Sequence, residues 1–280
     1  MADSDGNKSM VEILHPEVWS LAVRLSPDKL TYAISSRMDE NSLIFGHVDF
    51  AGSASKPIGD LESAIYDNEF FLYNYERTDF IVEAPHFLLV PDEFSKEGDA
   101  DECEKYYRYL YPDDKVAIRT DSIKDAAITV AYGIEPEVDA FLRRTFDNPP
   151  VMHLLTPMIR YFRKKGSFGT GGKMFAFIND GKVEIVALRN SKVIFANYFK
   201  FAATEDAFYY IMNAWKANGM SSETDELHLL GEKEVRKQLI AQIREYVSNT
   251  IQTIFPAQLL HLGKDAMIAP FDLIVLPLCE

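Results

Sequence analysis

The sequence predicts a mixed α/β protein that is built from two similar halves. In each half, three strand-like segments separated by short polar turns come first, and helix-like and strand-like segments then alternate. The first three strand segments of one half also match those of the other half in spacing. The chain has 280 residues, which is enough to bury two cores of medium size. We therefore expect one βββαβαβ plan to occur twice.

Short apolar segments rich in strand-forming residues open the first half. Their spacing is typical of antiparallel hairpins, and the first turn is formed by residues 26–29. The first half is predicted to contain strands at 19–25, 30–36, 43–50, 80–82, 86–90, 115–120 and 126–132, and helices at 61–72, 99–111, 135–146 and 154–165.

The second half follows the plan more clearly. Asn179, Asp180 and Gly181 indicate a tight turn, because these residue types tolerate positive φ. Thr204 is the expected N-cap of a helix that ends at Gly219. The other predicted elements are strands at 174–178, 183–188, 193–201, 226–230, 251–255 and 271–278, and a helix of about 16 residues along the apolar stripe Val235, Leu239, Ile243 and Val247.

A glycine-rich run separates the two halves and indicates a loop or linker. We expect a mobile N-terminal tail at 1–16, a first domain at 17–166, a linker at 167–172 and a second domain at 173–280. The segments at 21–25, 30–34 and 43–47 correspond to those at 174–178, 183–187 and 193–197, which indicates an internal duplication. Three antiparallel strands followed by αβαβ is the plan of ribonuclease H-like domains. Two of these in tandem form the actin-like ATPase fold, also found in sugar kinases and Hsp70.

Composition excludes several classes of partner. The chain carries 43 acidic and 29 basic residues, for a net charge of −14, so neither nucleic acid nor an anionic membrane is an expected partner. No apolar run approaches the roughly 20 residues of a membrane helix, and the polar start of the chain does not resemble a secretory signal. The two cysteines, Cys103 and Cys279, make no disulfide framework. We expect a cytoplasmic protein.

Several segments resemble the uncharacterised DUF3822 family of Bacteroidetes. They are the run Lys-Val-Ile-Phe-Ala-Asn-Tyr-Phe-Lys-Phe at 192–201, Glu-Asp-Ala-Phe-Tyr-Tyr at 205–210, Leu-His-Leu-Leu-Gly at 227–231 and the terminal Leu-Cys-Glu. The segment at 19–26 and the strand at 126–132 fit the family as well. The resemblance implies an actin-like ATPase fold and a bacterial cytoplasmic setting, and it implies no activity.

Actin-like ATPases hold their triphosphate between two hairpins that carry Asp, Gly and Ser or Thr near the turn. Glycine lets backbone N–H groups approach the phosphates, and the acid holds Mg²⁺ through water. Here the first turn contains Pro27, which has no N–H, and no glycine. The second turn lacks the spaced Asp-x-Gly and the following Ser or Thr. The candidate nucleotide-binding residues are Asp28, Asp180, Gly181, Lys182 and Gly231.

Other chemistries fit less well. The strand at 174–178 has no acid for a ribonuclease H-type two-metal site. The run at 167–174 lacks two required P-loop residues and precedes a strand. The six histidines have no metal-binding spacing, so we expect no catalytic and no metal-ligating residues.

Two functions remain open. The first is a catalytically inactive protein, a pseudo-ATPase that acts as a scaffold by binding a protein partner or another copy of itself and needs no cofactor. The alternative is a nucleotide-binding ATPase with degenerate phosphate-binding motifs, for which Mg·ATP is the cofactor. The clustered tyrosines fit either a partner-binding surface or the filling of a domain interface.

Overall fold

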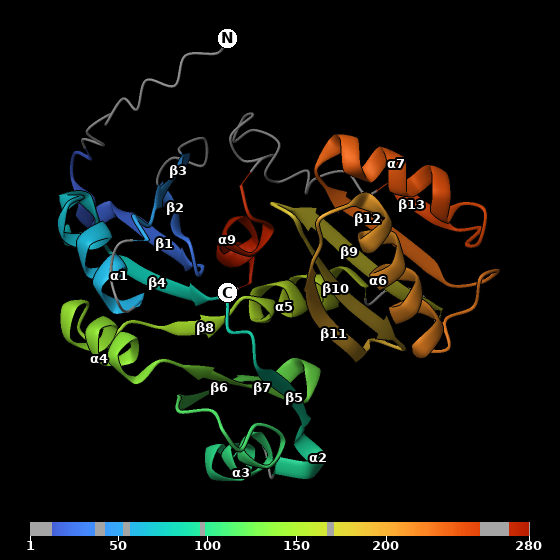
Figure 1. Ribbon diagram of the computed structural model, residues 1–280, viewed down its shortest axis with the longest axis horizontal. Helices are drawn as coiled ribbons and strands as arrows, with labels where there is room; N and C mark the ends of the chain where they lie inside the picture. Colours follow the sequence, from blue (N-terminus) through green and yellow to red (C-terminus); the bar gives the residue numbers. More distant parts are fainter. Residues whose placement is uncertain are drawn as a thin grey trace.

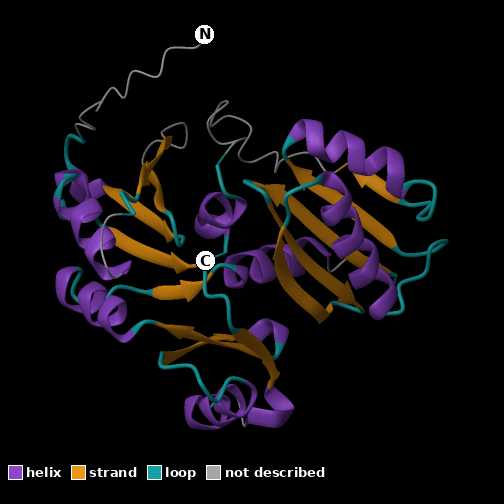
Figure 2. Cartoon of the chain, in the orientation of Figure 1, coloured by secondary structure: helices purple, strands orange, loops and turns teal. Residues whose placement is uncertain are grey.

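Two five-stranded sheets stand side by side, and a smaller third sheet adjoins the first (Figure 1). The computed structural model describes residues 13–36, 43–52, 57–95, 99–166, 171–252 and 269–279. Helices cover the outer faces of both large sheets, and two further helices lie between the sheets (Figure 2).

The first large sheet has the strand order β3-β2-β1-β4-β8. Its first three strands form antiparallel hairpins, and β4 and β8 then add parallel strands. Helix α1 precedes β4 and helix α4 precedes β8. The bounds are β1 Trp19–Leu25, β2 Lys29–Ser36, β3 Leu43–Asp49, α1 Pro57–Tyr66, β4 Arg77–Val82, α4 Pro136–Thr145 and β8 Val151–His153.

The second large sheet repeats this order as β11-β10-β9-β12-β13. Three antiparallel strands are again followed by two parallel ones, each preceded by a helix. The predicted duplication and the predicted fold class are therefore confirmed. The bounds are β9 Gly172–Asn179, β10 Lys182–Arg189, β11 Lys192–Lys200, α6 Thr204–Ala217, β12 Glu226–Gly231, α7 Lys233–Ile243 and β13 Thr250–Gln252.

The first half differs from the second by an insertion between β4 and α4. It forms a three-stranded antiparallel sheet in the order β5-β7-β6, covered by α3. The sequence predicts these strands but not their separation into a sheet of their own. The bounds are β5 Phe87–Pro91, α2 Asp92–Ser95, α3 Ala100–Leu110, β6 Ala117–Ile123 and β7 Ile128–Ile134.

The two helices between the sheets are exchanged between the halves. Helix α5 (Leu155–Gly166) follows the first sheet but lies against β10 and β11 of the second. Helix α9 (Phe271–Val275) follows the second sheet but lies against β1 and β2 of the first, and α5 and α9 pack on each other. One hydrophobic core therefore continues from the first sheet into the second.

The prediction of a strand at 271–278 is wrong. Residues 271–275 form α9, and Leu276–Leu278 form a 3₁₀ turn. Every residue of α9 is buried, so the segment lacks the polar face that marks a surface helix. An apolar run of this length cannot be assigned to helix or strand by periodicity, since both are apolar throughout when fully buried.

Other differences are local. The sequence misses β8, and the predicted helix at 61–72 ends at Tyr66, with a 3₁₀ turn following. Helix α7 is 11 residues long rather than about 16. Residues 253–255 of the predicted strand at 251–255 lie outside the described residues. Ile13, in the predicted tail, is buried, and Gly172, in the predicted linker, opens β9.

Three further findings concern the described residues. The N-cap of α6 is Ala203 rather than Thr204, and the carboxylate of Asp206 accepts the N–H of Ala203. Cys103 and Cys279 are both free thiols. None of the described helices is long and apolar enough to cross a membrane.

Candidate functional site

The turns of the first hairpins of the two large sheets meet between the two halves of the molecule. Lys29, the first residue of β2, pairs with Asp180 in the turn between β9 and β10, at 2.7 Å between Nζ and Oδ2. The structure thus brings together the two hairpins that the sequence predicts to face each other. The ion pair is partly exposed and lies at the outer edge of a larger set of charged contacts.

Local sequence explains the shape of both turns. Asp180 and Gly181 have φ of 51° and 66° between the paired residues Asn179 and Lys182, as a two-residue hairpin turn with positive φ requires. In the first turn the N–H of Ser26 donates to the carbonyl of Lys29. The turn closes without glycine.

Three of the predicted nucleotide-binding residues serve the hairpins themselves. Asp28 is exposed, and its carbonyl accepts the N–H of Phe50 at 2.8 Å. The carbonyl of Gly181 accepts the N–H of Phe201 at the same distance. The hydrogen bond from Lys29 lowers the pKa of Asp180 below its ordinary value.

Lys182 is buried and directed at the other half of the molecule. Its Nζ donates to Oε2 of Glu83, which follows β4, at 2.7 Å. The same oxygen accepts the hydroxyl of Ser26 at 3.0 Å. Burial of Glu83 raises its pKa, but Lys182, Arg24 and Ser26 together outweigh burial and lower the pKa below the ordinary value. The carboxylate is therefore ionised at neutral pH.

Arg24 of β1 joins three parts of the chain. Its guanidinium donates to Glu184 of β10 at 2.9 Å and to Asp272 of α9 at 3.0 Å. It also lies 3.9 Å from Glu83. All four side chains are buried. We refer to Arg24, Glu83, Lys182, Glu184 and Asp272 as the buried ionic cluster.

The buried ionic cluster contains three carboxyl groups and two cations. Burial raises the pKa of Glu184 to about 7, because the attraction of Arg24 offsets only part of the desolvation, and burial also raises the pKa of Asp272. No donor among the described residues reaches Oε2 of Glu184 or Oδ2 of Asp272. The exposed side chain of Lys200 adds a third cation at the edge of the cluster, because its Nζ lies 3.6 Å from Oε1 of Glu83.

Gly231, the fifth predicted residue, has a packing role. Its φ is +96°, and a Cβ at this position would lie 1.9 Å from the carbonyl oxygen of Ile178. The next residue, Glu232, donates its N–H to that oxygen at 2.8 Å. Glycine is therefore required where the end of β12 presses against β9.

The cations and one backbone donor near the facing turns already have partners within the chain. A triphosphate needs unpaired cations and free backbone donors, whereas Arg24 and Lys182 already bind carboxylates and the N–H of Asp180 donates to Glu232. Within the described ranges, no group of three or more His, Cys, Asp or Glu side chains is arranged to hold a metal ion.

Four members of the buried ionic cluster are absent from the sequence-based candidates. Arg24 and Glu184 are charged residues in the middle of apolar strands, and Asp272 interrupts an apolar run. A charge within a buried segment requires a partner, so this pattern is the signal that could have identified them. Glu83 directly follows the strand at 80–82 and gives a weaker signal.

Comparison with solved structures supports the fold. A protein of Bacteroides thetaiotaomicron VPI-5482 with an actin-like ATPase fold and unknown function aligns with a TM-score of 0.73 and 21% identity, over 84% of this chain and 90% of that one. The PilM–PilN type IV pilus biogenesis complex aligns with a TM-score of 0.57 and 12% identity, over 94% and 98% of the two chains. A comparison with curated protein sequences finds no match.

The sequence profile of the DUF3822 family, described as a protein of unknown function, matches residues 8–250. The chain belongs to this family. The resemblance seen in the sequence is therefore confirmed, together with the actin-like ATPase fold.

Proposed function

We propose that this DUF3822 protein is a non-catalytic member of the actin-like fold that acts as a scaffold by binding a protein partner, either a different protein or a second copy of itself. In this proposal no nucleotide cofactor is needed. The position between the paired hairpins serves to hold the two halves of the molecule together.

The observation that carries the proposal is the contact between Lys182 and Glu83. The lysine of the second hairpin donates to a carboxylate of the first sheet at 2.7 Å, and both side chains are buried. Removing this lysine to bind a phosphate would leave Glu83 buried without its closest cation, which costs about 3–5 kcal/mol for a buried pair. ATP would have to supply that free energy before any net binding.

Two observations support protein binding in place of catalysis. The PilM–PilN structure is a complex between proteins, and its fold resembles this chain over nearly the whole length. Several tyrosines are also exposed, including Tyr109 at 85% and Tyr209 at 62%. Tyrosine is enriched at protein interfaces because it combines a large apolar ring with a hydrogen-bonding hydroxyl.

A thermal-shift experiment with Mg·ATP, Mg·ADP and Mg·GTP tests the proposal. A nucleotide present at about 100 times its Kd would stabilise the protein by about 2.7 kcal/mol. We expect no shift with any of the three. A shift that Asp180→Ala abolishes would instead establish the nucleotide-binding alternative, since Asp180 lies at the turn that faces the other half of the molecule.

Sedimentation velocity over a range of protein concentrations then separates the two kinds of partner. A mass that rises with concentration identifies a second copy of the chain as the partner. A constant mass equal to one chain of 31.9 kDa leaves a different protein as the partner.

A further inference from the structure

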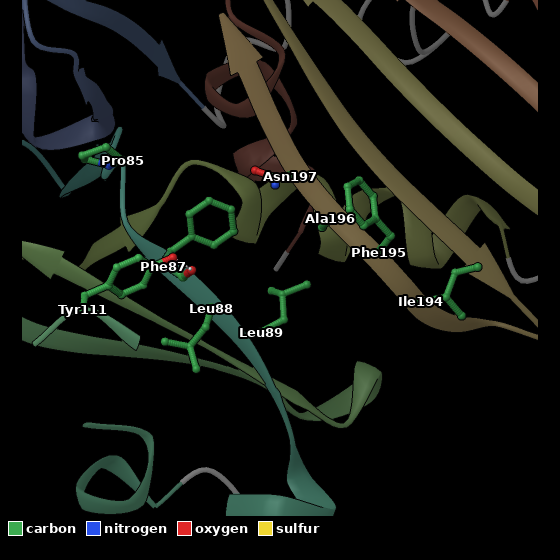
Figure 3. Close-up of a pocket in the computed structure, with 9 residues that line it drawn as sticks. All are labelled: Pro85, Phe87, Leu88, Leu89, Tyr111, Ile194, Phe195, Ala196 and Asn197. Carbon is green, nitrogen blue, oxygen red and sulfur yellow. Dashed lines mark hydrogen bonds between the residues drawn. The ribbon is translucent and has the colours of Figure 1, made fainter. Parts of the chain in front are cut away.

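Two sheet edges border one open cavity on the surface of the molecule. Strand β5 is an edge of the three-stranded sheet, and β11 is an edge of the second large sheet. The cavity between them has a volume of about 330 Å³ and is lined by residues of both strands and by Tyr111 (Figure 3). We call it the edge groove.

One end of the edge groove is held together by side chains. The hydroxyl of Tyr198 on β11 donates to the carbonyl of Ala84, just before β5, at 3.1 Å. The ring of Phe87 stacks on that of Tyr198 with centroids 6.0 Å apart. Starting from this end, β5 and β11 run in opposite directions. Phe87 lies near Asn197, and Leu89 lies further along the groove toward Ile194 than Phe87 does (Figure 3).

The register of each strand shows which backbone groups face the edge groove. On β5, the carbonyl of His86 accepts from β7 and the N–H of Asp92 donates to Ala127, so even-numbered residues pair with β7. On β11, the N–H of Phe201 donates to the carbonyl of Gly181, so odd-numbered residues pair with β10 up to the bulge at Ala187/Leu188. The backbone groups that face the edge groove are therefore those of the odd-numbered residues of β5 and the even-numbered residues of β11.

Some of these outward groups already have partners. The hydroxyl of Tyr111 donates to the carbonyl of Phe87 at 3.3 Å, and the side chain of Asn197 accepts the N–H of Tyr198 at 2.8 Å. The N–H and C=O of Leu89 and of Ala196 face the groove from opposite sides, and no hydrogen bond to them is seen within the described part of the chain. Unpaired edges of this kind accept an added strand.

The chemistry of the edge groove defines the occupant. Seven of its nine lining residues are apolar and none is charged, so the side chains of a segment that enters it should be uncharged and mostly apolar. Acidic residues lie at both ends of β5, namely Asp114, which binds His86 next to Tyr111, and Asp92 and Glu93, which follow Pro91, whereas β11 begins and ends with a lysine. With a net charge of −14 on the whole chain, a partner with basic flanks is attracted.

We propose that an extended, apolar peptide segment of a different protein, flanked by basic residues, enters the edge groove as an added strand between β5 and β11. Its backbone pairs with Leu89 and Ala196, and its alternate side chains occupy the cavity. This deepens the proposed function by naming the surface and the class of partner. It makes no use of the buried ionic cluster, so peptide binding and nucleotide binding are tested independently.

The probe is a displayed library of random dodecapeptides, selected on the full chain and then measured as synthetic peptides by fluorescence anisotropy. We expect selected peptides with alternating apolar residues between lysines or arginines. Ala196→Pro removes the outward N–H without breaking the ladder to β10, and should weaken binding roughly two- to tenfold, the effect of one hydrogen bond. Ala196→Ser keeps that N–H and serves as the matched control, with unchanged affinity.

Two further readouts keep the test decisive if Ala196→Pro does not fold. N-methylation of either alternating set of peptide amides should weaken binding, because a strand between two edges directs one set toward β5 and the other toward β11. In the wild-type complex, hydrogen exchange at Leu89 and Ala196 should slow at least roughly tenfold, while Val90 and Phe195, which already pair within their sheets, should not change. The proposal is overturned if the library yields no binder, or if binders protect other amides and tolerate N-methylation in both sets.

Discussion

The Nζ atom of Lys182 lies 2.7 Å from Oε2 of Glu83, so a buried lysine of the second sheet neutralises a buried carboxylate at the end of a strand of the first. In the actin-like ATPase fold this is the region between the paired hairpins. The ion pair occupies it with groups from the chain itself. The stability of this protein should therefore depend on this buried ion pair.

The first prediction concerns Lys182. Lys182→Met leaves three buried carboxyl groups against one buried cation and should lower the free energy of unfolding by about 3–5 kcal/mol. Glu83→Gln should also lower it, because it leaves Lys182 buried without the carboxylate that it binds. Urea unfolding measures both. The matched control is Lys29→Met. Because Asp180, the partner of Lys29, is 52% exposed, this variant should lose under about 1 kcal/mol of unfolding free energy. Equal losses for the two lysine variants would contradict the assignment.

The second prediction is a pH dependence from Glu184. Because burial raises its folded pKa to about 7, above the ordinary value of 4.5, the folded protein binds more protons than the unfolded chain between these values. Its contribution to stability is therefore present below about pH 4.5 and is lost as the pH rises toward 7. Unfolding of wild type and Glu184→Gln should show the wild type losing stability relative to the variant over this range. A constant difference would mean that Glu184 titrates normally.

The third prediction has the opposite sign and concerns His153 at the end of β8. Its Nδ1 accepts the N–H of Leu155, and its Nε2 lies 3.3 Å from the carbonyl of Ala84, so the ring is neutral with its proton on Nε2. Burial lowers its pKa from 6.5 to about 4. Stability from this group is present above about pH 6.5 and falls as the pH drops to about 4, by about 3 kcal/mol in all.

Comparing His153→Gln with the wild type isolates this effect of His153. The variant should be less stable at pH 7, and the gap should narrow as the pH falls, since only the wild type must keep an uncharged imidazole buried. A gap that widens toward low pH would show that the buried ring is protonated in the folded protein.

The fourth prediction separates two glycines with positive φ. Gly231→Ala would place a Cβ 1.9 Å from the carbonyl oxygen of Ile178, so the backbone would have to move. We expect the free energy of unfolding to fall by at least about 3 kcal/mol, because backbone strain and the displacement of β9 add together. Gly219→Ala is the control, because its φ is +58° but nothing lies within 4 Å of the added atom. It should lose only about 1 kcal/mol. Thermal unfolding of the two variants measures the difference.

Much of the fold could be predicted from local sequence. The hairpins of both halves, the turn at Asn179, Asp180 and Gly181, and the amphipathic helices α4 and α6 depend on residues close together in the chain. The repeated order of strands could also be predicted, because each half carries its own copy of the pattern. These features follow from backbone preferences and periodicity, which neighbours in the sequence determine.

The candidate site could be predicted only in part. The sequence places Asp180 and Lys182 at the turn facing the other half, but it does not show that Lys29 and Glu83 meet them. Glu83 and Lys182 are 99 residues apart. No local pattern encodes a contact over such a separation, and only the packing of one sheet against the other decides it.

Local sequence was enough to predict the strand-rich plan and its duplication. Tertiary structure alone decided that residues 151–153 form a strand, that 271–275 form a helix, and that the helices between the sheets are exchanged between the halves. A three-residue strand exists only because β4 offers it an edge to pair with, and an apolar segment buried on all sides takes the conformation that its surroundings accommodate. In both cases the deciding free energy comes from contacts with distant parts of the chain, and so it leaves no periodicity in the sequence.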